Sequence, residues 1–119
     1  MIFVFGSNLA GRHGAGAAKY AFLKYGAEYG VGEGRTGDAY AIPTKGRSLE
    51  RLPFSEIDAA IVRFLKHAAQ HHDEMFLLTP IGTGLAGHSK RSVWSVLGRE
   101  GLSSNVVLSH TWVDTKEGD

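Results

Sequence analysis

Two glycine-rich segments hold the residue types in this 119-residue chain that are best suited to chemistry. The first, Gly6 to Gly16, follows the apolar run Ile2 to Phe5, and the second, Ile81 to Gly87, follows the apolar run at 76–78. A strand followed by a glycine-rich loop and then a helix forms a typical phosphate-binding site. Backbone N–H groups converge there, and the helix dipole favours an anion. The two segments therefore predict a phosphate or pyrophosphate site.

Candidate ligand-binding residues come from both loops and from the end of a third apolar run. Dense glycine lets the backbone approach a ligand closely, and an arginine can fork onto phosphate oxygens. The same residues also suit ordinary turns and caps, and that alternative stays open. The candidates are Gly6, Ser7, Asn8, Gly11, Arg12, Gly14, Gly16, Thr44, Gly82, Thr83, Gly84, Leu85, Gly87 and His88.

Three ionisable residues near these segments are candidates for proton transfer or nucleophilic attack. His13 lies at the tip of the first loop and can carry a proton near neutral pH. Lys45 follows an apolar run and can attack an electrophilic carbon if burial lowers its pKa, although a plain phosphate or solvent contact is the simpler assignment. Glu33 lies in a glycine-rich stretch that suits either a lid or a solvated loop.

Alternating apolar runs and helical patterns supply the elements that position these residues. The helix at 15–25 is expected to stop at Gly26, and the second helix starts with Ser55-Glu56-Ile57-Asp58, a capping pattern. The segment 26–37 holds too many glycines for a regular element. We expect strands at 2–5, 38–43, 75–79 and 105–109, and helices at 15–25, from 55 to about 68, and at 90–99.

This order of elements predicts the α/β class, with a compact, mostly parallel sheet of about four strands inside a three-layer αβα arrangement. In such sheets ligands bind beyond the carboxyl ends of the strands, where the strand order reverses. If the strands at 2–5 and 75–79 are neighbours, their two loops flank one crevice. The function predicted from the residues depends on that adjacency.

Composition limits the classes of protein. A formal net charge of +1 does not indicate a duplex nucleic-acid binder, and no apolar run is long enough to span a membrane. The chain has no cysteine, which excludes disulfides and thiolate metal sites. His67, His71 and His72 lack a third ligand of obvious spacing, so we expect no metal and no cofactor. We expect one domain over 1–119 with a frayed tail at 111–119, a cytoplasmic location, and either a monomer or a homo-oligomer.

The motifs of these segments resemble those of a known family. The unit around Ser7-Asn8-Leu9 and its glycine-rich loop resembles the ADP-ribose-binding macrodomains. Ala39 to Pro43 resembles the following macrodomain strand, and Ile81 to Gly87 resembles the second phosphate loop. Over residues 2–95 the motifs are most similar to a group of short, uncharacterised bacterial and phage macrodomain-like proteins. The chain lacks the macrodomain N-terminal strand and has Gly46 where related sequences carry an acid.

The resemblance implies a strand order of 4-1-3-2 and the binding of ADP-ribose or a related nucleotide diphosphate between the two loops. It places Asn8 at the distal ribose, where its amide can also orient a water near the anomeric carbon. One alternative is an ADP-ribosyl hydrolase in which Asn8 places the water and His13, Glu33 or Lys45 transfers the proton. A second alternative is a non-catalytic sponge or sensor of a nucleotide signal.

Overall fold

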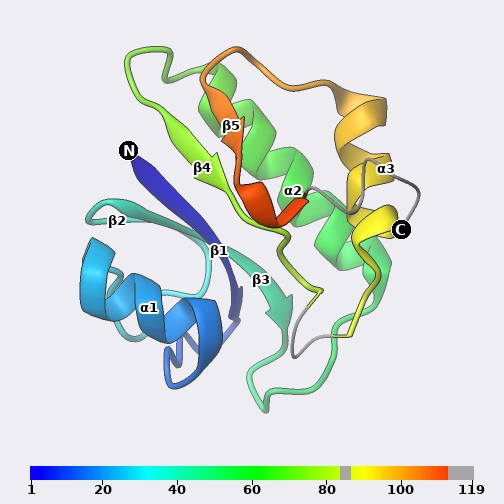
Figure 1. Cartoon of the computed structure of the whole chain (residues 1–119). Coiled ribbons are helices and arrows are strands. Elements are labelled where there is room, and N and C mark those ends of the chain that lie inside the picture. The colour runs from blue at the N-terminus through cyan, green and yellow to red at the C-terminus, as the bar shows by residue number, and fades with distance from the viewer. Residues whose placement is uncertain (84–86, 113–119) are drawn as a thin grey trace.

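A five-stranded sheet lies between two helical layers in the computed structural model, which describes residues 1–83 and 87–112 (Figure 1). Helix α1 covers one face of the sheet, and α2 and α3 cover the other. The elements are β1 (Ile2–Asn8), α1 (Gly16–Tyr25), β2 (Gly34–Thr36), β3 (Ala39–Lys45), α2 (Phe54–Ala69), β4 (Phe76–Leu78), α3 (Lys90–Glu100), β5 (Val106–Leu108) and the short 3₁₀ helix η1 (His110–Trp112).

Strand β1 is buried on both faces because its side chains alternate between the two helical layers. Val4 belongs to the cluster that packs under α2 and α3, whereas Phe3 and Phe5 pack on the α1 side. Small residues let α1 come close to the sheet on that side, namely Ala18 and Ala21 from the helix and Ala39 and Ala41 from β3. The continuous apolar run that predicted the strand is typical of a sheet covered on both faces.

The strand order is β2-β3-β1-β4-β5, with β1 parallel to both β3 and β4. The predicted adjacency of the strands at 2–5 and 75–79 is confirmed. The order 4-1-3-2 is wrong, because β3 pairs with β1 and β5 pairs with β4. The two seven-residue strands, β1 and β3, pair along most of their length and form the longest ladder, which leaves the three-residue β5 at an edge.

The count of four strands is also wrong, because part of the segment 26–37 forms β2. This strand runs antiparallel to β3 through a tight turn in which Gly37 has a φ of 55°. An ion pair of 2.5 Å between Arg35 and Glu74 ties β2 to the segment before β4. The glycines that hid the strand in the sequence allow the turn and the close approach of the backbone.

Helix boundaries agree with the sequence except at the start of α2. Helix α1 stops at Gly26, which has the left-handed φ of 74° expected of a terminating glycine. Helix α2 begins after Pro53 with no side-chain cap, so the capping role predicted for Ser55 is wrong. Asp58 instead binds the guanidinium of Arg99 on α3 at 2.7 and 2.9 Å, and thereby links the two helices.

The start of the predicted tail is ordered. Trp112 lies in η1 with 1% of its surface exposed and donates from Nε1 to the carbonyl of Leu78 at 2.8 Å. Thr111 and Trp112, the first described residues of the tail predicted at 111–119, therefore lie in η1, and residues 113–119 lie outside the described ranges. Among the helices of those ranges, none is long and apolar enough to cross a membrane.

Stability is expected to fall as the pH drops through about 6.5, because the folded chain resists protonation of His67. Burial, followed by the charge of neighbouring His71, lowers the pKa of His67 below its ordinary value, although Glu74 acts in the opposite direction. The two rings stack with centroids 4.0 Å apart. The unfolded chain therefore takes up the proton first.

Urea titrations between pH 7.5 and 5 should show a shallower decline in the free energy of unfolding for His67→Gln, and an unchanged decline for the control His72→Gln. Equal slopes for His67→Gln and wild type would contradict the assignment.

Candidate functional site

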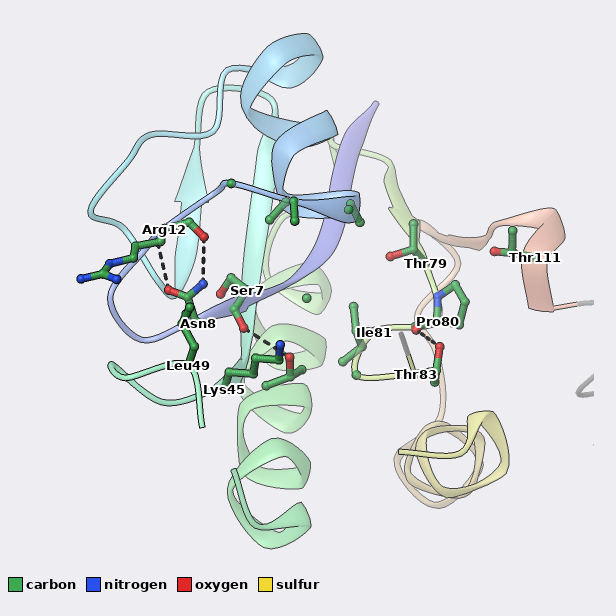
Figure 2. Close-up of a pocket in the computed structure, with 18 of the residues that line it drawn as sticks. Ser7, Asn8, Arg12, Lys45, Leu49, Thr79, Pro80, Ile81, Thr83 and Thr111 are labelled. Carbon is green, nitrogen blue, oxygen red and sulfur yellow. Dashed lines mark hydrogen bonds between the residues drawn. The ribbon is translucent and has the colours of Figure 1, made fainter. Parts of the chain in front are cut away.

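A cavity of about 830 Å³ opens beyond the carboxyl ends of β1, β3 and β4 (Figure 2). The chain leaves β1 toward α1 on one face of the sheet and leaves β4 toward α3 on the other. The two loops therefore diverge, and the space between them is the switch point at which α/β sheets bind ligands. Lys45 and Leu49 close the cavity on the β3 side.

The structure brings ten of the sequence-predicted site residues together around this cavity. They come from four separate segments: the end of β1, the loop before α1 with the first residue of that helix, the end of β3 and the loop after β4. The ten are Gly6, Ser7, Asn8, Arg12, Gly14, Gly16, Thr44, Lys45, Gly82 and Thr83.

Gly6 brings the two loops close enough to share a wall. A Cβ atom on Gly6 would lie 3.3 Å from the backbone nitrogen of Gly82, which is tighter than ordinary side-chain contacts. Gly82 itself has a φ of 75°, in the left-handed region that favours glycine. The glycines at this point therefore have a packing role between the loops as well as giving a ligand room.

The N-terminus of α1 opens into the cavity without a side-chain cap. Ala15 is the capping residue, with an extended backbone (φ −152°, ψ 161°) and no side-chain hydrogen bond. The first backbone N–H groups of any α-helix lack a partner within the helix, and here Gly16, Ala17 and Ala18 all line the cavity. These donors and the helix dipole favour an anion at this position.

Four of the hydroxyl groups on the described lining donate to main-chain carbonyls. This uses the single proton of each hydroxyl and fixes the side-chain rotamers. The bonds run from Ser7 to Gly32, from Thr44 to Ser7 (3.2 Å), from Thr79 to Val4 (2.6 Å) and from Thr83 to Pro80 (2.6 Å).

The side-chain amide of Asn8 is also hydrogen-bonded to the main chain. Its Nδ2 donates to the carbonyl of Arg12 at 2.8 Å, and its Oδ1 accepts from the backbone N–H of Arg12 at 2.9 Å, so the side chain closes its own loop (Figure 2). Only 8% of Asn8 is exposed. The guanidinium of Arg12 extends away from this turn at the rim of the cavity.

Lys45 begins a tight connection that also places Leu49 at the cavity. The N–H of Gly46 donates to the carbonyl of Glu50 at 2.8 Å, and Leu49 is held at a φ of 65°. A Cβ atom on Gly46 would lie 2.3 Å from a carboxylate oxygen of Glu50. Because these atoms are the end of a flexible side chain, Glu50 could turn aside, and the contact alone does not require glycine at this position.

Two of the predicted proton-transfer residues are held elsewhere. His13 is 1% exposed, lies between Phe5 and Tyr29, and donates from Nε2 to the carbonyl of Glu28 at 2.8 Å. It supports the loop from beneath and does not appear among the described residues that line the cavity.

Glu33 forms an ion pair with Arg63 of α2, with an Oε2–Nε distance of 2.6 Å. This hydrogen bond holds the pKa of the Arg63 guanidinium above its ordinary value. Burial, and then the charge of Glu33, raises the pKa of nearby Tyr40 to about 12. Glu33, directly before β2, is therefore tied to α2 and is absent from the described lining of the cavity.

The remaining candidates also lie outside the described lining or the described residues. Gly11 packs against the backbone of Gly30. His88 contacts the guanidinium of Arg51 at 3.2 and 3.3 Å and lies near Gly87 at the start of the α3 segment. Gly84 and Leu85 fall within the residues that the structure does not describe.

Sequence reasoning missed a set of mostly apolar lining residues. Some are adjacent to predicted positions, and the alanines at the start of α1 signal a helix whose end lies open. Tyr29 and Leu49 reach the cavity from distant loops and carry no signal in the sequence. The full set is Ala15, Ala17, Ala18, Tyr29, Leu49, Thr79, Pro80, Ile81 and Thr111.

No protein-family model matches the chain, and no curated protein matches it significantly. Its fold is similar to that of a solved structure described as a protein of unknown function from Bacteroides thetaiotaomicron. The TM-score is 0.60 at 13% sequence identity, and the match covers 90% of this chain and 85% of that chain. At this identity the similarity shows a shared fold alone.

Proposed function

We propose that the chain binds ADP-ribose or a related nucleoside diphosphate, with the diphosphate at the N-terminus of α1 between the two glycine-rich loops. The observation that carries this proposal is the uncapped first turn of α1, which opens into a cavity of about 830 Å³. That volume falls within the range of roughly 300–1,000 Å³ typical of small-molecule sites.

The charges around the cavity support an anionic ligand. Lys45 and Arg12 both line it, and no aspartate or glutamate is found among the lining residues that the structure describes. The helix N-terminus adds partial positive charge at the same place. The sequence resemblance to macrodomains adds ADP-ribose as the first ligand to test.

Binding is better supported than hydrolysis. The amide of Asn8 is engaged by the backbone of Arg12, His13 is buried beneath the loop, and Glu33 is paired with α2. Lys45 is the remaining member of the predicted catalytic set, and it suits a phosphate contact. A non-catalytic sponge or sensor of a nucleotide would need nothing more than such a binding site.

Calorimetric titration of the full chain with ADP-ribose, ADP and pyrophosphate tests the proposal. Lys45→Met is expected to weaken binding of all three about tenfold, because a hydrogen bond to a charged group is lost. Lys24→Met, in the last turn of α1 and far from its N-terminus, is the matched control and should bind like wild type. Chromatography of the recovered ADP-ribose should show it intact. Absence of binding to all three ligands would overturn the proposal.

A further inference from the structure

We propose that the cavity binds nucleoside diphosphates without selecting the base; this inference rests on the proposed function. A protein distinguishes bases by hydrogen bonds to their edges, where donors and acceptors form a pattern specific to each base. Strong discrimination arises when a site positions polar groups that only one ligand can satisfy. Base selection in this cavity therefore depends on the polar side chains that are not already hydrogen-bonded within the chain.

Four of the hydroxyl groups on the described lining already use their proton within the chain, and the hydroxyl of Thr111 shares a 2.6 Å hydrogen bond with that of Ser109. Ser7, Thr44, Thr79 and Thr83 each donate their single proton to a main-chain carbonyl, and both ends of the Asn8 amide are held by the backbone of Arg12. Turning any of these groups toward a base would leave a carbonyl unpaired, and buried unpaired groups are costly. These hydroxyls therefore help to maintain the shape of the cavity, and they offer a base acceptor oxygens only.

The donors that stay available are suited to phosphate. They include the backbone N–H groups at the start of α1 and the side chains of Lys45 and Arg12, which carry positive charge or partial positive charge. The hydroxyls of Tyr29 and Thr111 are further side-chain donors on the described lining. Among the described lining residues no carboxylate is present to accept a hydrogen bond from a base.

Apolar and aromatic surfaces are left to contact the base. Tyr29 lines the cavity with its ring packed edge-on against Phe22 at 4.8 Å, and a ring of this kind stacks on any base. Leu49 lines the β3 side, is 45% exposed, and is held at a φ of 65° that strains a residue with a side chain. An exposed leucine kept in a strained conformation at the cavity fits a role in covering the apolar face of the base.

Titration of the full chain with ADP, GDP, UDP and CDP tests the inference. We expect dissociation constants within about fivefold of one another, and AMP to bind at least about tenfold more weakly than ADP because one phosphate is missing. A preference of about fiftyfold or more for one diphosphate would overturn base indifference while leaving the proposed function intact. If neither these four ligands nor pyrophosphate bound, the proposed function itself would fail.

Leu49→Gly separates a covering role from a role in folding. Glycine relieves the backbone strain, so we expect the melting temperature to rise by about 4 °C. Binding of all four diphosphates should weaken by a similar factor of about five, whereas pyrophosphate, which has no base to cover, should bind as to wild type. Equal weakening of pyrophosphate, or unchanged binding of the nucleotides, would overturn the role assigned to Leu49.

Discussion

Replacing Ala15 with aspartate is expected to raise the melting temperature of the protein and to weaken ADP-ribose binding by at least about 100-fold. The wild-type residue caps α1 without any side-chain hydrogen bond. An aspartate at this position would accept from the free N–H groups of the first turn, which stabilises a helix by about 1 kcal/mol. It would also occupy the donors that we assign to the diphosphate and repel it, since two like charges 4 Å apart near a protein surface interact by about 4 kcal/mol.

Ala15→Asn is the matched control, because asparagine caps a helix about as well as aspartate but carries no charge. It should raise the melting temperature to a similar extent and weaken binding by only about tenfold. Thermal denaturation and calorimetry measure the two effects separately. If Ala15→Asp bound ADP-ribose as tightly as wild type does, the diphosphate would not lie at the N-terminus of α1.

Gly11→Ala is expected to destabilise the protein by more than about 3 kcal/mol, enough to remove a large part of the stability of a domain this size. The φ of Gly11 is 69°, which alanine adopts only with strain, and its Cβ would lie 2.4 Å from the carbonyl carbon of Gly30. Because the overlap is with backbone, no side-chain rotation can relieve it. The variant should also lose the cavity, since Gly11 joins the loop after β1 to the segment behind it through a 3.0 Å bond from the N–H of Gly30.

Gly101→Ala separates the strain of a positive φ from the overlap with the backbone of Gly30. Gly101 has a similar φ of 80° at the end of α3, but among the described residues no atom from elsewhere in the chain lies within 4 Å of the position that a Cβ methyl group would take. Its cost should be the conformational strain alone, about 1 kcal/mol. Urea denaturation midpoints of the two variants measure the difference, and equal destabilisation would show that the contact with Gly30 contributes nothing.

The helices and the central strands could be predicted because their signals are local. The apolar run at 2–5 and the stripe from Ile57 to Ala68 depend on near neighbours alone. Strand order depends on which distant segments share a ladder, and the order implied by the resemblance differed from the one observed. Strand β2 was missed because three residues that begin with Gly34 carry no periodic signal.

The residues of the site likewise divide into those predicted from local signals and those that depend on contacts between distant segments. Residues at the carboxyl end of a strand, such as Thr44 and Lys45, could be placed at the cavity because parallel strands end at one edge of a sheet. Neighbours in a loop point in different directions, and for this reason Arg12 reaches the rim of the cavity while His13 turns into the core. Leu49 could not be predicted, since its position depends on the turn that closes between Gly46 and Glu50.

The hydrogen bonds that tie Ser7, Thr44, Thr79 and Thr83 to the main chain also bear on how quickly a ligand is captured. Few rotamers have to freeze when a ligand arrives, so little conformational entropy is lost on association. We therefore expect encounter to be limited by diffusion and by attraction to Lys45 and the helix terminus, with nearly the same on-rate for every diphosphate. Differences in affinity between ligands would then appear in the time for which each remains bound.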